Sequence, residues 1–441
     1  MYGHLGVLTT IISHYIAYMR CAFYLAVVFL VSPPLALGES MKNYGEFILE
    51  VESGWPSEAP VALLPSAALP AAGAELLQQL RDRVLEQEFS GGPYAAQLGE
   101  TLGDLARALD AAGEPEEALR VRRRALHLTR LNDGLYSSSQ GPLVRAILDG
   151  HRRRGDFTAL DEQYRYFFRL FGDGRPPYTG PRWRSSMEFL RWQREALRRD
   201  LDRDGSRRLL DLHTLNASIL KELMSGEKTP IWRQIKEASL SQLLNLYLVE
   251  QRVRPAVEPL RRPGESLRRD EFGSFDLQRD RLETLQRVLR QSGAKLLQDA
   301  LAVAPPGKFR DVAELRLALA DWRQWHGGWQ EASRDYLELW QELHKRGLSS
   351  LAARWFSKPV PLPDNGAFWL PDRPARELLA SEIRVSERGR ARSELALEKD
   401  SQGRSTNSLR RHLNATVFRP AIRDGRFVEM VLRDQRYYLY E

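Results

Sequence analysis

The sequence predicts a mostly α-helical protein: helical hairpins that form a solenoid, followed by a small C-terminal α+β domain with a three-stranded antiparallel sheet and one helix. Amphipathic helical periodicity dominates residues 76–347, and an apolar helix, a Gly-centred turn and a second helix recur within that stretch. Strand-like alternation replaces the helical pattern near the end of the chain. At 441 residues the chain is too long for one ordinary core, which also favours more than one domain.

The first 38 residues have the composition of an export signal. One basic residue, Arg20, and no acidic residue occur before Gly38, and an apolar run occupies Cys21–Val31. Small residues then precede a polar stretch, so we predict a secretory signal peptide at residues 1–38, cleaved after Gly38. An uncleaved membrane anchor is the alternative, and Met19 is an alternative start. Because the signal contains the only cysteine, the mature chain would hold no disulfide.

Composition divides the rest of the chain into four parts. Residues 39–75 are rich in Ala and Pro, which predicts a linker. The helical repeats follow at 76–347, a second linker at 348–375 and the α+β domain at 376–441. We therefore expect two unlike folded modules.

The helical hairpins have a common arrangement of small and large residues. Their turns centre on Gly113, Gly155 and Gly327–Gly328. Small residues on the second helix, such as Ala118 and Ala125, let the two helices approach closely, while larger apolar residues fill the groove to the next hairpin. This pattern resembles the tetratricopeptide repeat family, which implies hairpins stacked into a superhelix. A generic helical bundle is the alternative. The clearest stretches are Ala108–Leu128, Ala146–Leu170 and Ala318–Leu343.

The net charge of +7 is spread along the helical pattern. Lys and Arg alternate with Asp and Glu and do not gather in one block. This is typical of solvated helix faces and argues against a nucleic-acid partner. No nucleophile, phosphate-loop or metal-ligand spacing stands out, and the histidines are scattered. We therefore predict no catalytic residues, no cofactor-binding residues and no enzyme activity.

One segment has the ligand spacing of a calcium-binding loop. Carboxylates stand at positions 1, 3, 5 and 12 of the pattern, a backbone carbonyl at position 7, and Gly205 supplies the bend at position 6. Arg207 takes the place of the usual apolar residue, so a solvated turn whose acids balance its arginines is the alternative. Calcium is the one cofactor that the sequence leaves open. The candidate ligands are Asp200, Asp202, Asp204, Ser206 and Asp211.

The C-terminal pattern predicts two strands, a helix and a last strand. Alternation on both sides of Gly389 predicts a hairpin, and residues 405–417 predict a helix with one apolar side. The phrase FRPAIRDGRFVEM then leads into the final strand. It is similar to the C-terminal domain of the TonB energy-transducer family. The resemblance implies structural roles for these residues. Phe418 would pack under the helix, Pro420 and Ala421 would start the crossing to the last strand, and Asp424 and Gly425 would form the turn.

The same resemblance implies a way of binding peptides. Members of that family capture a short peptide of an outer-membrane protein by adding it to a sheet edge. The residues of the last strand that would flank such a peptide are Tyr437, Tyr438 and Tyr440.

These predictions describe a non-enzymatic periplasmic protein-interaction adaptor, secreted across the inner membrane of a Gram-negative bacterium. Its partners would be other proteins or peptides of the cell envelope, and it would contact the membrane only through an uncleaved N-terminal segment. One alternative is an inner-membrane-anchored TonB-like energy transducer for outer-membrane transport. Another is an envelope enzyme without a recognisable motif.

Overall fold

The computed structural model describes eight stretches of the chain. The described residues are 47–50, 58, 73–202, 205–225, 231–253, 273–370, 377–393 and 403–440. The chain forms two compact units, Met1–Tyr44 and Gly45–Glu441, and the described residues all belong to the second. The predicted signal peptide therefore lies outside the described residues.

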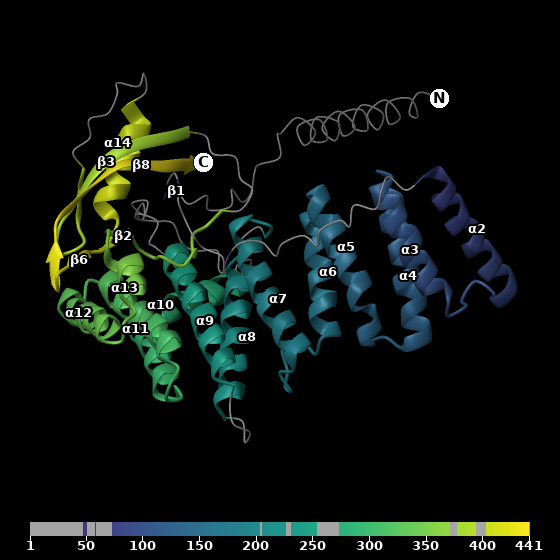
Figure 1. The fold of residues 1–441 in the computed structure, drawn as a ribbon, viewed down its shortest axis with the longest axis horizontal. Coiled ribbons are helices and arrows are strands. Elements are labelled where there is room, and N and C mark those ends of the chain that lie inside the picture. Colours follow the sequence, from purple (N-terminus) through teal and green to yellow (C-terminus); the bar gives the residue numbers. More distant parts are fainter. Residues whose placement is uncertain are drawn as a thin grey trace, which may run out of the picture. The chain divides into compact units, whose positions relative to one another are not determined.

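The described residues are mostly helical, as the sequence predicts (Figure 1). A single turn of 3-10 helix, Ser138–Gln140, precedes α5. The α-helices are α2 (Ala74–Gly91), α3 (Leu98–Ala111), α4 (Pro115–Asp133), α5 (Gly141–Arg154), α6 (Phe157–Leu170), α7 (Gly180–Arg198), α8 (Ser206–Ser225), α9 (Trp232–Val253), α10 (Gly273–Ala302), α11 (Phe309–Trp325), α12 (Trp329–Lys345), α13 (Ser349–Phe356) and α14 (Gly403–Ala415).

Each helix from α2 to α13 packs against the next helix in the chain. The three stretches with the clearest hairpin pattern form the pairs α3 and α4, α5 and α6, and α11 and α12. Gly113, Gly155 and Gly327 have φ angles of +81°, +69° and +77° at the connecting turns, a conformation that glycine adopts most easily. Ala118 and Ala125 are fully buried at the close approach of α4 to its neighbours.

The C-terminal sheet has the antiparallel arrangement that the sequence predicts, plus one further strand. Its order is β1, β8, β3, β4, and each neighbouring pair is antiparallel. The predicted second strand continues into residues 394–400, outside the described part. The strands are β1 (Phe47–Glu50), β2 (Val360–Pro361), β3 (Glu377–Val385), β4 (Ala391–Ser393), β5 (Phe418–Arg419), β6 (Ala421–Arg423), β7 (Arg426–Val428) and β8 (Met430–Tyr440).

The extra strand, β1, comes from the predicted linker at 39–75. Phe47 pairs with Tyr440 and Glu50 with Tyr437, so β1 lies along the end of β8. The apolar residues of this short stretch, Phe47, Ile48 and Leu49, suit a strand, but its partner lies at the opposite end of the chain.

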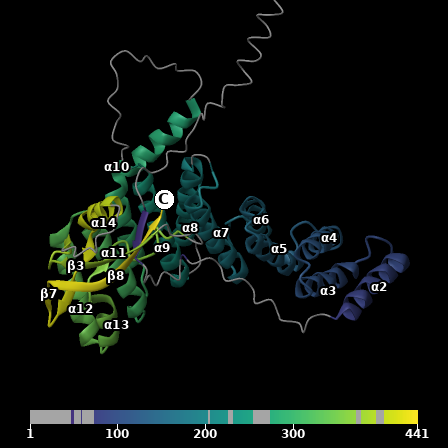
Figure 2. The same ribbon diagram turned by 90° about the horizontal axis from the view of Figure 1, so that it is seen from above.

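The second predicted linker, 348–375, also contains regular structure. Helix α13 buries Ala352 and Phe356 against α12, and β2 pairs with β5. β2 and β5 form a two-stranded sheet of their own, as do β6 and β7. β5 packs against α11 and β6 against α13, so these strands lie beside the last helices of the row (Figures 1 and 2). Helices and sheet together form one compact unit.

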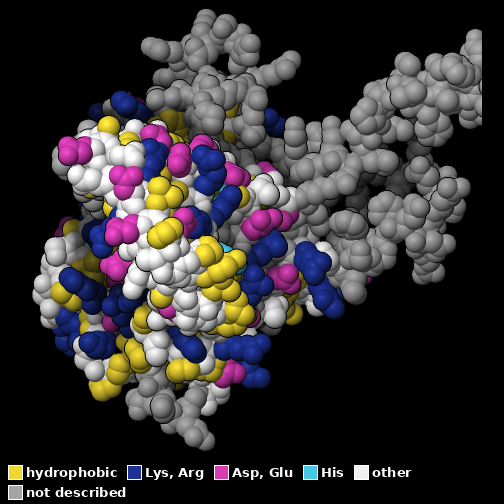
Figure 3. Space-filling view, turned by 90° about the vertical axis from the view of Figure 1, so that its right-hand side faces the viewer, with side chains coloured by type: hydrophobic (Ala, Val, Ile, Leu, Met, Phe, Trp, Pro, Cys, Tyr) yellow, Lys and Arg dark blue, Asp and Glu magenta, His cyan; other side chains and the backbone are white. Residues whose placement is uncertain are grey.

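Charged side chains are distributed over the visible surface. On the face drawn in Figure 3, Lys and Arg are interspersed with Asp and Glu. This agrees with the alternation of charge in the sequence.

Candidate functional site

A cleft of about 1110 Å³ is lined by alternate helices of the second half of the helical region. Residues of α7, α9, α11 and α13 line it, together with the segment 358–365, Arg419 of β5 and Glu58. Among the described residues, the intervening helices α8, α10 and α12 contribute none to the lining. The cleft therefore has one wall built by helices that alternate along the chain.

The cleft wall combines apolar and charged side chains. Leu240 and Leu351 are half-buried along it, and Ile231 at its rim is 56% exposed. Trp183 is buried and donates its indole N–H to the Glu237 carboxylate at 2.7 Å. An apolar wall with polar groups at fixed positions is typical of binding surfaces.

Every carboxylate that lines the cleft is paired with a basic side chain. Glu188 forms a bidentate pair with Arg145, one oxygen accepting at 2.6 Å, and Glu314 accepts from Lys236 at 2.7 Å. The full set, with basic partners, is Glu58 with Arg194 and Arg198, Glu188 with Arg145, Glu237 with Arg233, Glu314 with Lys236, and Asp321 and Asp364 with Arg419.

Four basic side chains of the cleft have no such partner. Arg184, Arg354 and Lys358 are exposed, and Arg191 is half-buried. None of the four forms an ion pair with a carboxylate of the described residues. Because each described acid of the cleft already has a basic partner, these four side chains offer positive charge to an incoming anion.

Glu58 lies fully buried at the floor of the cleft. Arg194 reaches its carboxylate through Nε at 3.0 Å and Nη2 at 2.9 Å, and Arg198 through Nη2 at 2.7 Å. Burial alone would raise the pKa of Glu58, but the two guanidinium groups hold it below its ordinary value. Glu58 is therefore ionised in the folded protein at neutral pH.

A second ion network lines the cleft, in which the buried Arg419 and Asp321 meet the more exposed Asp364. Arg419 is 1% exposed, and its Nη2 donates to Asp321 at 2.6 Å and to Asp364 at 3.3 Å. Tyr336 donates its hydroxyl to Asp321 at 2.8 Å. Burial raises the pKa of the Asp364 carboxyl, against the opposing effect of Arg419. This network joins β5 to α11.

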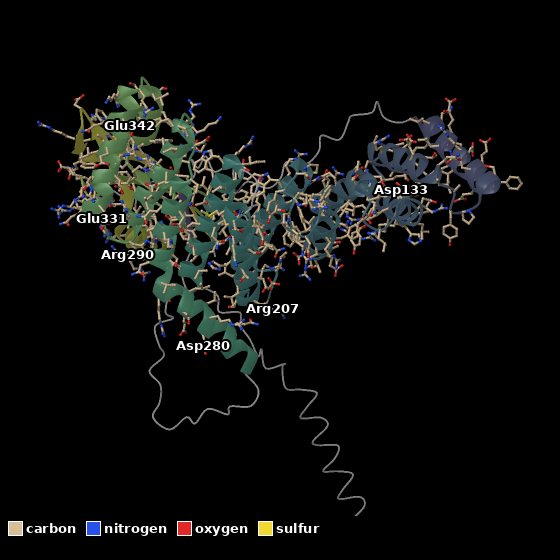
Figure 4. The ribbon with its side chains drawn as sticks, turned by 90° about the horizontal axis from the view of Figure 1, so that it is seen from below. Asp133, Arg207, Asp280, Arg290, Glu331 and Glu342 are labelled. Atoms are coloured by element: carbon tan, nitrogen blue, oxygen red, sulfur yellow. The ribbon has the colours of Figure 1, made fainter. Side chains whose placement is uncertain are left out.

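Two of the five predicted calcium-loop residues, Asp202 and Asp211, form arginine pairs. Asp202 pairs with Arg208, whose Nη1 also donates to Asp161 at 2.9 Å. Asp211 lies on α8, with Arg207 at 3.9 Å. Arg207 extends from the start of α8 at the surface (Figure 4). Asp204 lies outside the described residues.

The two carboxylates thus have separate cationic partners, which favours the alternative interpretation of a solvated turn. Asp200 has a φ angle of 53°, and Ser206 is the first residue of α8. Within the described part of the chain, no group of three or more His, Cys, Asp or Glu side chains has an arrangement that would hold a metal ion.

The residues of the predicted TonB-like motif lie in the sheet module. Phe418 is buried in one cluster with Leu409 and Leu413 of α14. Asp424 and Gly425, with φ angles of 49° and 76°, form the two-residue turn between β6 and β7. Pro420 is buried between β5 and β6, and Ala421 is buried as the first residue of β6.

The three candidate docking tyrosines lie on β8, and all three pair with β1. Tyr437 and Tyr438 pair with β3 on one side and with β1 on the other. Tyr437 and Tyr440 are buried, and Tyr438 is half-buried. At these positions the sheet edge expected from the sequence is covered by the chain's own β1.

Comparison with known proteins gives no relative: no family model matches the chain, and no curated protein matches it. Of the helices that the structure describes, none is both long and apolar enough to cross a membrane. Sequence reasoning missed Glu58, Arg194 and Arg419, since each has an ordinary local context and gains its role from a partner distant in the chain.

Proposed function

We propose that the chain is a non-enzymatic periplasmic adaptor that binds other polypeptides of the cell envelope. The observation that carries the proposal is the cleft, with its apolar wall, its neutralised acids and four basic side chains that no described carboxylate pairs with. Its volume of about 1110 Å³ exceeds the range of about 300–1,000 Å³ common for small-molecule sites. An extended polypeptide with acidic residues would fill such a cleft and complement its charge.

The helices that line the cleft support a binding surface of the helical-repeat kind. In tetratricopeptide-like arrays, hairpins stack so that alternate helices form one extended surface for a partner. We propose that α7, α9, α11 and α13 serve in this way. The C-terminal sheet, which we propose to be TonB-like, would add a second docking element through strand addition at an edge.

Cross-linking from inside the cleft tests the proposal. A photo-reactive amino acid at Ile231 should capture a polypeptide in living cells, because Ile231 is 56% exposed at the rim. The same group at Val288 of α10, 45% exposed and outside the cleft, is the matched control. Equal capture at both positions would contradict the proposal.

Charge reversal gives the second arm of this test. Arg191→Glu together with Lys358→Glu should reduce cross-linking from Ile231 by about tenfold or more, because an acidic partner would then meet like charge. The control is Arg120→Glu on α4, where the side chain is 74% exposed. This substitution should leave the cross-linking yield from Ile231 unchanged.

The periplasmic part of the proposal has its own measurement. Mass spectrometry of the mature protein should find Glu39 as the first residue. A chain that retains residues 1–38 would instead favour a membrane-anchored protein.

A further inference from the structure

The floor of the cleft contains a site built for a carboxylate. Both oxygens of Glu58 accept from Arg194, with Nε at 3.1 Å from one and 3.0 Å from the other, and Arg198 adds a bond of 2.7 Å. Two guanidinium groups around one carboxylate give several charge-assisted hydrogen bonds in a fixed geometry.

Other parts of the fold hold these arginines in place. Arg194 Nη1 donates to Ser241 Oγ and to Asn245 Oδ1 of α9, both at 3.0 Å. Arg198 Nε donates to the carbonyl of Ala367 at 3.0 Å. The guanidinium groups are therefore oriented by α9 and by the segment after α13, independently of Glu58.

The residue that fills this site comes from the same part of the chain as β1. Strand β1 covers the end of β8, where the sequence predicts peptide docking, and Glu58 fills the arginine pair of the cleft. Residues 47–50 thus occupy the candidate docking position on the sheet, and Glu58 occupies the candidate docking position in the cleft between the helices. Both are positions that a partner polypeptide would use under the proposed function.

We propose that Arg194 and Arg198 form a carboxylate-recognition site for an acidic partner polypeptide, and that Glu58 occupies this site until the partner displaces it. The inference rests on the proposed function, since it names the ligand chemistry of the same cleft. Arg191 and Lys358, which also line the cleft and pair with no described carboxylate, add attraction for the acidic residues that surround the recognised carboxylate. The recognised group is a Glu or Asp side chain or a C-terminal carboxylate.

Chemical rescue of the full chain tests the site without a known partner. In Glu58→Ala, propionate should raise the melting temperature saturably, by about 3 °C or more, because it restores a carboxylate between the two arginines. Sodium chloride of equal ionic strength and neutral propionamide should not. Wild type should show no such rise, since Glu58 already fills the site.

Arg194→Met added to Glu58→Ala should abolish the response to propionate. If propionate stabilises wild type, Glu58→Ala and the double variant equally, or stabilises none of them, the site is refuted. Glu58→Ser, which also removes the carboxylate and leaves space for propionate between the arginines, provides the same measurement if Glu58→Ala does not fold.

Peptide probes then identify the source of the carboxylate. A labelled, end-blocked peptide of residues 55–61 should bind Glu58→Gln about tenfold more tightly than the same peptide with Gln in place of its Glu. If the Gln peptide with a free C-terminus binds equally well, the C-terminal carboxylate is the recognised group. Equal binding of both end-blocked peptides would overturn the proposal.

The two proposals fail in different ways. If Ile231 captures no polypeptide but propionate still rescues Glu58→Ala, the carboxylate site stands and the adaptor function does not. If Ile231 captures a polypeptide and Glu58→Gln leaves the amount unchanged, Glu58 does not compete with the partner and this inference fails.

Discussion

The carboxyl group of Glu58 links the stability of the fold to pH. Its folded pKa lies below the ordinary value of 4.5, although burial opposes this, because Arg194 and Arg198 favour the charged form. Such a group stabilises the fold above its unfolded pKa, and the contribution is lost as pH falls through the folded pKa. In Glu58→Gln, the free energy of unfolding should therefore fall less steeply than in wild type below about pH 5.

Urea unfolding at a series of pH values between neutrality and about pH 3 measures this slope. Glu86→Gln on α2, an exposed position, is the control and should keep the slope of wild type. Parallel pH profiles for wild type and Glu58→Gln would show that the Glu58 carboxylate does not titrate with unfolding.

Arg419 and Asp321 should show strong thermodynamic coupling. Arg419→Met leaves Asp321 buried beside Tyr336 without its cation, which should cost about 3–5 kcal/mol of unfolding free energy. Asp321→Leu in the same chain should recover part of that loss, since the uncompensated charge is removed. Urea unfolding of the two single variants and the double variant gives the coupling energy. If the losses of unfolding free energy in the two single variants simply add up in the double variant, Arg419 and Asp321 are not coupled.

The sequence could not predict these buried pairs, because charge pairing depends on positions far apart in the chain. Glu58 stands 136 and 140 residues from its two arginines. Arg419 lies inside the FRPA phrase, yet the resemblance draws attention to Phe418 and Pro420 beside it. Only the burial of Arg419 distinguishes it from the many exposed arginines of the helices.

The β3–β4 hairpin depends on the close approach of two backbones. Gly389 has a φ angle of +71°, and a Cβ atom there would lie 2.0 Å from the carbonyl oxygen of Phe418. Gly389→Ala should therefore destabilise the protein through both the positive φ angle and a backbone clash.

Gly113→Ala is the matched control for this effect. Gly113 has a φ angle of +81°, but no atom lies within 4 Å of the Cβ position. We expect a loss of about 1 kcal/mol for Gly113→Ala and a clearly larger loss for Gly389→Ala, measured by urea unfolding. Equal losses would mean that the hairpin relaxes away from β5.

Helices and strands differ in how far the sequence predicts them. The helical hairpins follow from local periodicity and Gly turns, so their positions agree with the structure. Strand β1 is four residues long and becomes regular structure only by pairing with β8. Helix α13 lies in a stretch expected to be a linker, because eight residues are too few for a clear helical period.

At the scale of the whole molecule, the helices and the sheet are bonded into one unit. Gln324 of α11 donates to the carbonyl oxygens of Arg388 at 2.9 Å and Phe418 at 3.1 Å, and Arg419 pairs with Asp321 on the same helix. The sequence predicts separate modules joined by a linker, since composition does not reveal these contacts. These contacts would keep the cleft wall and the sheet at a fixed distance and orientation. Under the proposed function, a partner could then contact both.

This coupling predicts shared hydrogen-exchange behaviour. In wild type, the slowest amides of β3, β8 and α11 should open with the same free energy, because the buried ions and hydrogen bonds join them. In Arg419→Met, β3 and β8 should exchange faster, while α3 to α6, which do not contact Arg419, should keep their rates. Native-state exchange followed by mass spectrometry measures both groups. If β3 and β8 already open independently of α11 in wild type, the sheet is a separate folding unit and Arg419 does not join it to the helices.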